Sequence, residues 1–245
     1  MGTPSRFVHG LNNLPPYHPL ANYPLPFQLY NNNQFIDFHT YAAGDWTVTT
    51  TTGSTALAAG NGGLITQTTS NTSSDIQFNL KNPAAFQITS GQDAWFVWRG
   101  RVDTVANSTW QIGLQAGGTA LAPTDGVYFT KAAAATTVSL VLTKASSSTT
   151  LSLGSGLVLA DATNVVLMWY YNARTATVYA YAGTSTDADF FNSITSYYSA
   201  EVGQTTLTNL PTATNLAIGF GVQTNTAATR ALTTDYIGAA VTLTR

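Results

Sequence analysis

Two neighbouring runs between residues 93 and 115 alternate between apolar and polar positions, which predicts a pair of β-strands. One face of the first strand is expected to carry Ala94, Phe96, Trp98, Gly100 and Val102, and the opposite face Arg99 and Arg101. In the second strand, Trp110, Ile112 and Leu114 alternate with Gln111, Gly113 and Gln115. A period of two with aromatic and β-branched residues indicates strands with one buried face. We therefore place this pair at the centre of the fold.

A second strong pattern predicts a hairpin between residues 165 and 182. The run Val165 to Tyr171 is apolar on both faces, which favours an inner strand that is covered on both sides. The next four residues, Asn-Ala-Arg-Thr at 172–175, have the composition of a turn. A returning strand is then expected over 176–182.

Further short strands with turns between them extend this pattern along the chain. We expect them near 46–48, 64–68, 76–80, 86–88, 127–130, 138–142, 216–222 and 235–244. Residues 112–115 (IGLQ) resemble residues 220–223 (FGVQ), which suggests that these two strands are paired in a similar environment. No long helix is predicted. Many short strands at this spacing predict an all-β domain over 41–245, an antiparallel β-sandwich or jelly roll.

Residues 1–40 differ from the rest and predict an extended N-terminal arm. Six of the nine prolines lie here, and proline is incompatible with a helix interior or a central strand. The arm is also rich in apolar and aromatic residues, unlike a disordered tail. We expect it to lie on the protein's own body or on a neighbouring subunit. Its candidate contact residues are Phe7, Leu11, Leu14, Tyr17, Leu20, Tyr23, Phe27 and Tyr30.

The low charge of the chain limits the classes of partner that it is expected to bind. Charged residues make up only 8% of the sequence, against roughly 25% in an average soluble protein. The net charge is −2 and there is no basic stripe, so a nucleic-acid partner is not expected. No apolar run approaches the roughly 20 residues of a membrane-spanning helix, so no membrane partner is expected either. A weakly charged surface limits repulsion between copies and suits a homo-oligomer.

The residues that most enzymes require are scarce. The three histidines, His9, His18 and His39, all precede residue 41, and cysteine is absent. A Ser-His-Asp or Cys-His site is therefore not expected within the predicted sandwich, nor is a zinc site. Glycoside hydrolysis uses two carboxylates, yet Glu201 is the single glutamate. We predict that the protein is not an enzyme and carries no cofactor or metal.

Two weaker signals concern ligands. Asp187 and Asp189 form the one close pair of aspartates, and such a pair in a loop suits a calcium ion as well as plain solvent exposure. Eight aromatic residues would form a sugar-stacking platform if they were exposed, although aromatic residues in strands more often pack in the core or across strands. They are Trp95, Trp110, Tyr128, Tyr170, Tyr179, Tyr181, Tyr197 and Tyr198.

Several stretches resemble structural proteins of tailed bacteriophages. They are GDWTVTTTTGSTALAAGNGGLITQTT, WFVWRGRV, the segment from IGLQ through PTDGVYF, and the closing FGVQ and TDYIGAA. The sequence resembles head decoration (cement) proteins with a concanavalin/laminin-G-like jelly roll. This resemblance covers most of 41–245 and leaves out the proline-rich arm.

The resemblance implies a non-enzymatic protein of the virion. Such a protein is made in the host cytoplasm and binds the major capsid protein on the exterior of the head, and the three-fold positions of a capsid would suit a trimer. A protein that binds the assembled head preferentially stabilises it. Our interpretation of the arm as an anchor comes from its composition and not from the resemblance.

Two other functions remain open at this stage. The alternative is a carbohydrate-binding, lectin-like module on a virion or fibre, with a glycan as its partner. The third is a glycosidase or another enzyme, against which the single glutamate and the absence of histidine after residue 41 argue.

Overall fold

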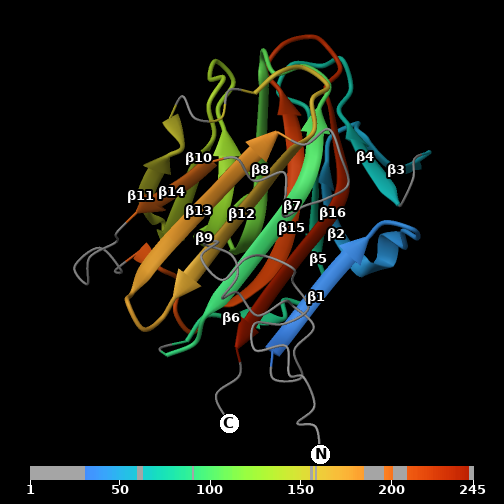
Figure 1. Cartoon of the computed structure of the whole chain (residues 1–245). Coiled ribbons are helices and arrows are strands. Elements are labelled where there is room, and N and C mark those ends of the chain that lie inside the picture. Colours follow the sequence, from blue (N-terminus) through green and yellow to red (C-terminus); the bar gives the residue numbers. More distant parts are fainter. Residues whose placement is uncertain are drawn as a thin grey trace, which may run out of the picture.

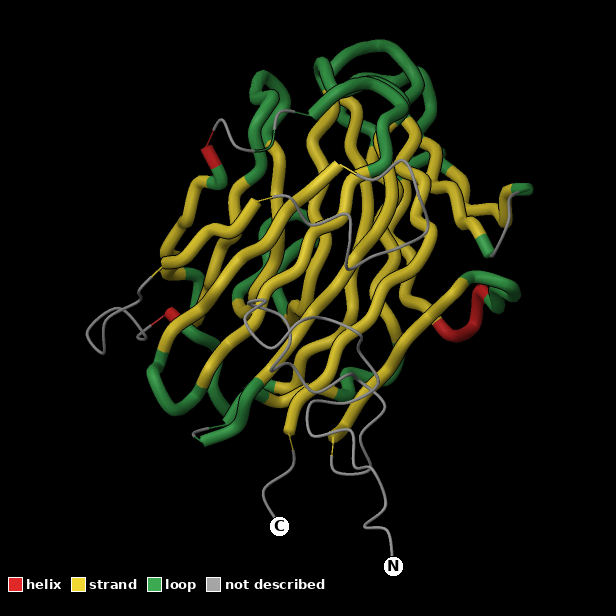
Figure 2. The backbone as a smooth tube through the Cα atoms, in the orientation of Figure 1, coloured by secondary structure: helices red, strands yellow, loops and turns green. Residues whose placement is uncertain are grey.

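The computed structural model describes residues 31–59, 63–89, 91–154, 157, 159–184, 196–200 and 209–242. Within these ranges the chain is almost entirely strand and turn, as Figure 2 shows. A short 3-10 helix spans Ala43–Asp45, and Gly154 and Asn209 also have 3-10 conformation. None of the described helical segments is long and apolar enough to cross a membrane.

The described strands form two sheets that stack face to face (Figure 1). The first sheet has the order β14-β13-β12-β7-β16-β4-β3, with β1 also paired to β16. Its strands are β1 (Asn31–Asp37), β3 (Ser54–Ala58), β4 (Leu64–Thr68), β7 (Ala94–Val102), β12 (Val165–Asn172), β13 (Thr177–Thr184), β14 (Ser196–Ala200) and β16 (Ala231–Thr242). All of its pairings are antiparallel.

The second sheet has the order β11-β10-β9-β8-β15-β5-β2, with the short β6 paired to β15. Its strands are β2 (Trp46–Thr50), β5 (Ile76–Lys81), β6 (Phe86–Gln87), β8 (Ser108–Ala116), β9 (Asp125–Lys131), β10 (Ser139–Lys144), β11 (Ser147–Ser152) and β15 (Asn215–Thr224). These pairings are antiparallel as well. The predicted all-β antiparallel sandwich is therefore confirmed.

The two central strands predicted from 93–115 lie opposite each other across the sandwich. β7 belongs to the first sheet and β8 to the second, so the loop between them crosses from one layer to the other. The predicted faces are confirmed, because Phe96 and Trp98 of β7 and Trp110 of β8 are all buried in the interior. The rings of Trp98 and Trp110 lie 6.1 Å apart and join the two layers.

The similarity between 112–115 and 220–223 marks two strands that are paired in the second sheet. Ile112 of β8 lies opposite Phe220 of β15, and Gly113 lies opposite Gly219. On the outward side of this sheet, Gly221 lies opposite Phe78 of β5. A Cβ atom at Gly221 would collide with the Phe78 ring and with the backbone of β5, so only glycine fits there. The predicted pairing is thus confirmed.

The hairpin of β12 and β13 is confirmed with its turn at 173–176. Leu167 and Trp169 of β12 face the main core, while Met168 faces outward. Met168 is buried on that outward side in a second apolar cluster with Trp95, Tyr181 and Ala240. The prediction that β12 is covered on both faces is therefore confirmed.

One strand of the first sheet lies within residues 1–40, the segment predicted as the N-terminal arm. Residues Asn31–Asp37 form β1, which pairs with β16 along its whole length. Phe38 follows it into the core, where its ring lies 5.6 Å from that of Phe220. The eight candidate contact residues of the arm, from Phe7 to Tyr30, lie outside the described residues.

Candidate functional site

A depression of about 350 Å³ lies at one end of the first sheet, where β7 begins and where β12 and β16 end. This volume is within the range of sites for small molecules, roughly 300 to 1,000 Å³. The residues that line it come from three segments that are distant in the sequence. They are Gly91, Asp93, Tyr170, Asn172, Ala173, Arg174 and Thr242.

Asp93 holds these segments together. One carboxylate oxygen accepts a hydrogen bond from the Tyr170 hydroxyl at 3.0 Å, and the other accepts one from the backbone nitrogen of Ala173 at 2.8 Å. The backbone nitrogen of Asp93 donates to Oγ1 of Thr242 at 2.8 Å. Each carboxylate oxygen has a second lone pair, so Asp93 keeps acceptor capacity for a ligand.

Tyr170 remains a hydrogen-bond donor throughout the physiological pH range. Its burial raises the pKa of the phenol above the ordinary value, and the negative charge of Asp93 and the hydrogen bond to it raise this pKa further. The phenol is therefore protonated and its proton is directed at Asp93.

The turn between β12 and β13 positions Arg174 at the rim of the depression. Oδ1 of Asn172 accepts hydrogen bonds from the backbone nitrogens of Arg174 and Thr175, at 2.9 and 3.3 Å. Such a bond from an asparagine side chain to the backbone two residues on is an Asx turn. The Arg174 side chain is exposed and makes no hydrogen bond or ion pair with the described residues. Its guanidinium is thus available to a ligand.

A row of aromatic rings runs from the depression across the outward face of the first sheet. Trp95, Tyr170 and Tyr179 lie at paired positions on β7, β12 and β13. The ring centroids of Trp95 and Tyr170 lie 5.4 Å apart, those of Tyr170 and Tyr179 lie 6.1 Å apart, and both pairs are stacked. Because the faces of these rings cover one another, the row presents mainly ring edges and hydroxyl groups to a ligand.

The predicted eight-residue aromatic platform is divided by the fold. Trp110 is in the core, and Tyr128 lies on the outward face of the second sheet, where its hydroxyl is 3.1 Å from Oγ1 of Thr143. Trp95, Tyr170, Tyr179 and Tyr181 share the outward face of the first sheet. Nothing is described of the side chains of Tyr197 and Tyr198. Cross-strand pairing, the more common role for strand aromatics, is confirmed for three of the eight.

The other candidate ligand positions from the sequence find no support in the described part of the chain. Asp187, Asp189 and Glu201, together with His9 and His18, lie outside the described residues. His39 is described and lies 3.0 Å from the carboxylate of Asp37. Within the described ranges, no group of three or more His, Cys, Asp and Glu side chains is placed to hold a metal ion. The absence of a cofactor and of catalysis stays a prediction.

Sequence reasoning missed most of the residues that form the depression. Asp93, Asn172, Arg174 and Thr242 appear in the sequence as a strand start, a turn and a strand end. The turn at 172–175 was the one available signal, and it carries no information about the segments that meet there.

Comparison with known proteins supports the fold. No protein-family model and no curated protein sequence matches this chain. Many solved structures do match. Arcelin-5, a lectin-like defense protein from Phaseolus vulgaris, is 7% identical with a TM-score of 0.59, and the match covers 88% of this chain and 100% of arcelin-5.

Two further structures show the range of activities on this fold. The lectin UEA-II, solved in complex with galactose, is 12% identical with a TM-score of 0.56, over 86% of this chain and 98% of the lectin. An endo-1,3-beta-glucanase from Streptomyces sioyaensis is 10% identical with a TM-score of 0.56, over 90% of this chain and 99% of the enzyme. At these identities the likeness establishes a concanavalin-like β-sandwich and no function. The resemblance to phage proteins is supported in its fold only.

Proposed function

We propose that this protein binds saccharides through the depression at Asp93 and does not cleave them. The observation that carries this proposal is the convergence of Asp93, Tyr170, Asn172 and Arg174 on one depression of about 350 Å³. Sites for small ligands typically place a few polar groups in a concave, partly apolar surface. The lectin solved with galactose and the lectin-like arcelin-5 have the same fold, which supports the proposal.

The polar groups of the depression match the chemistry of a sugar. Sugar hydroxyl groups both donate and accept hydrogen bonds. Asp93 offers acceptor lone pairs, and Arg174 offers several N–H donors. The faces of the half-buried Tyr170 ring are covered by Trp95 and Tyr179, so its edge offers a bound sugar van der Waals contact and no stacking surface.

The same set of residues argues against hydrolysis at this site. Glycosidases use two carboxylates about 5 to 9.5 Å apart, one on each side of the bond that is cleaved. Asp93 is the one carboxylate among the described residues that line the depression. Its two oxygens are engaged by Tyr170 and by the backbone of Ala173, which makes it a binding group.

A glycan array probed with the full chain tests this proposal. We expect a defined set of saccharides to bind, and we expect Arg174→Ala to weaken the best of them about tenfold in a calorimetric titration. This is the magnitude of one lost charge-assisted hydrogen bond. The control is Arg230→Ala, which removes a half-buried arginine just before β16, far from the depression, that donates to the backbone carbonyl of Ala106. If no saccharide binds, or if both variants bind as the original protein does, the proposal is wrong.

A second candidate function is attachment to a phage head as a decoration protein. One observation favours a protein partner of this kind: the outward face of the second sheet has no charged side chain at its strand positions. The charged residues in the described strands of this sheet all lie at strand ends, at positions that alternate with the outward-facing ones. They are Lys81, Asp125, Lys131 and Lys144. A wide uncharged face avoids like-charge repulsion when many copies lie side by side.

Cosedimentation with purified phage heads tests this candidate. We expect the full chain to pellet with heads built from the major capsid protein, and we expect a variant without residues 1–30 to remain in the supernatant. Circular dichroism of the truncated variant provides the folding control. Equal pelleting of both forms would exclude the arm as the anchor, and no pelleting of either form would exclude the decoration role.

A further inference from the structure

A second, smaller depression lies on the outward face of the first sheet, toward the other end of β7. Its volume is about 160 Å³, and it is formed by β7, β16, the start of β4 and the residue that precedes β12. The lining residues are Leu64, Arg99, Gly100, Arg101, Asn164, Thr233 and Asp235. Arg101 lies eight positions after Asp93 along the extended chain of β7, which at roughly 3.3 Å per residue is about 26 Å. The two depressions are therefore distinct.

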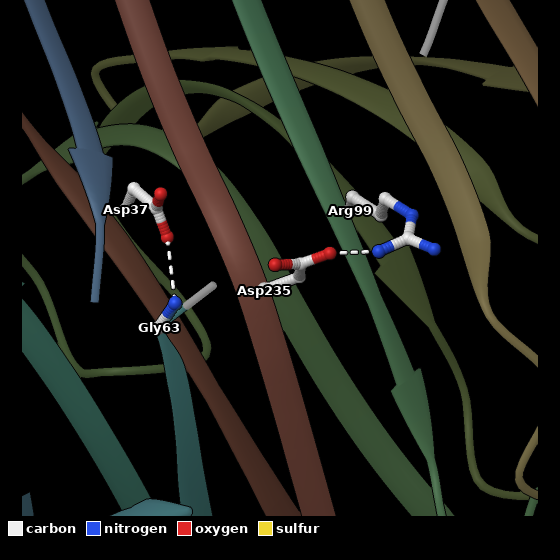
Figure 3. A network of polar contacts seen from close by, with 4 residues as sticks. All are labelled: Asp37, Gly63, Arg99 and Asp235. Atoms are coloured by element: carbon white, nitrogen blue, oxygen red, sulfur yellow. Dashed lines mark hydrogen bonds and ion pairs between the residues drawn. The ribbon is translucent and has the colours of Figure 1, made fainter. Parts of the chain in front are cut away.

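A bulge in β16 supplies the charge partner of Arg99. The register between β7 and β16 shifts between Thr234 and Tyr236, so Asp235 is the extra residue. Such a bulge redirects a side chain. Here the Asp235 carboxylate is directed toward the Arg99 guanidinium, with which it forms an ion pair (Figure 3). The side chains are only 11% and 14% exposed, so these two charges compensate each other with little access of solvent.

The nearby carboxylate of Asp37 is also engaged. It accepts a hydrogen bond from the backbone nitrogen of Gly63 at 3.0 Å (Figure 3). Its second oxygen lies 3.0 Å from Nε2 of His39. Neither Asp37 nor Asp235 is therefore free to compensate a further positive charge at this depression.

Arg101 is that further charge. It projects from the same face of β7 as Arg99, is exposed, and makes no hydrogen bond or ion pair with any described residue. Asn164 lines the same depression, and its side-chain amide likewise has no hydrogen-bond partner in the described part of the chain. Two groups with unused N–H donors thus face one small depression in which Asp235, the one carboxylate of its lining, is already paired.

We propose that this depression binds an anionic group, the carboxylate or sulfate ester of an acidic saccharide. A guanidinium donates paired hydrogen bonds to two oxygens of a planar carboxylate or of a tetrahedral sulfate. The volume lies below the roughly 300 Å³ at which sites for whole small ligands begin, so the depression accommodates a substituent of a larger molecule. That this molecule is a saccharide rests on the proposed function. The Arg101–Asn164 anion site rests on its own geometry.

A pair of polymers with one backbone tests the inference. Dextran and dextran sulfate differ only in the sulfate esters, and both are titrated against the full chain at low and at physiological salt. We expect dextran sulfate to bind more tightly than dextran, and we expect Arg101→Gln to weaken its binding about tenfold. The control Arg230→Gln removes the same charge outside the depression and is expected to change binding less than twofold. Added salt is expected to weaken the binding of dextran sulfate more than that of dextran, because salt screens exposed charges.

The outcomes separate this inference from the proposed function. Saccharide binding in the glycan array together with equal binding of dextran sulfate by Arg101→Gln and the original protein would overturn the anion site and leave the proposed function intact. Binding of inorganic sulfate that depends on Arg101, with no binding of any acidic polymer, would overturn the saccharide assignment. Equal losses of dextran sulfate binding in Arg101→Gln and Arg230→Gln would show a general charge effect and would overturn the anion site at Arg101. Unchanged thermal unfolding of Arg101→Gln confirms that its fold is intact.

Discussion

Replacing Lys131 with methionine is expected to lower the free energy of unfolding by about 3 kcal/mol, because it removes the hydrogen bonds of a buried ammonium group to three backbone carbonyl groups. Lys131 ends β9 and is 1% exposed. Its ammonium group donates to the backbone carbonyl oxygens of Val105, Ser108 and Ala133, the last two at 2.6 and 3.3 Å. Methionine fills a similar volume and cannot donate to any of them.

The position of these carbonyl groups makes the effect large. Val105 lies in the loop that carries the chain from β7 in the first sheet to β8 in the second, and Ala133 follows β9. Burial and the nearby charge of Arg230 lower the pKa of Lys131 to about 8, although the charge of Asp161 opposes this change. At pH 7 the ammonium form therefore still predominates and supplies its donors.

Urea unfolding followed by tryptophan fluorescence measures the loss. The control is Lys144→Met, which removes a half-buried lysine with one hydrogen bond to Oγ1 of Thr212 at 3.1 Å. Lys144→Met is expected to lower the free energy of unfolding by about 1 kcal/mol or less. Equal midpoints for the two variants would contradict the role assigned to Lys131.

Asp75→Asn is expected to lower the free energy of unfolding by about 2 kcal/mol at pH 7. It is also expected to remove the part of the acid destabilisation that comes from protonation of Asp75. Asp75 is 1% exposed, and its carboxylate accepts hydrogen bonds from the backbone nitrogens of Ser70 and Thr52 at 2.5 and 3.1 Å. It also accepts one from the Thr52 hydroxyl at 3.3 Å. These bonds tie the connection between β2 and β3 to the loop that precedes β5.

The sign of the pH effect follows from the pKa of Asp75. Burial raises this pKa, but the hydrogen bonds from Ser70, Thr52 and Ile76 outweigh burial and lower it from 3.8 to about 2. The unfolded chain therefore takes up a proton at this carboxyl before the folded chain does. The stabilisation is complete above about pH 4 and is lost as the pH falls toward 2.

Melting temperatures between pH 2 and pH 7 test this expectation. The original protein is expected to lose stability more steeply below pH 4 than Asp75→Asn does. Asp45→Asn is the control, because the Asp45 carboxylate is 61% exposed and its ion pair with Lys81 lies at the surface. Parallel pH profiles for the original protein and Asp75→Asn would contradict the assignment.

Much of the strand pattern was predictable because it depends on local geometry. Successive side chains of a strand point to opposite faces, so the inward set of β7 is evident from residues 94–102 alone. The turn between β12 and β13 was equally evident, because Asn172 caps its own following backbone. The likeness of residues 112–115 to 220–223 even indicated a pairing over more than 100 positions.

The edge of the sandwich was predicted less well. β1 has the sequence NNNQFID, which is too polar to indicate a strand, and the proline-rich segment before it suggested one continuous arm to residue 40. Its hydrogen bonds are provided by β16, some 200 residues later in the chain. An edge strand of this kind is recognised from its partner and not from its own composition.

Composition and side-chain alternation alone were enough to predict a weakly charged, cysteine-free all-β chain with distinct inward and outward faces. Which strands share a sheet, and which ends of strands meet, depends on long-range pairing that is seen in the folded chain alone. Asp93, Arg174 and Thr242 form one depression, and Arg101 and Asn164 another, because antiparallel pairing brings distant segments to the same end of a sheet. Each of those residues follows an ordinary local rule. Their ligand-binding chemistry arises from the register between strands, which no local pattern encodes.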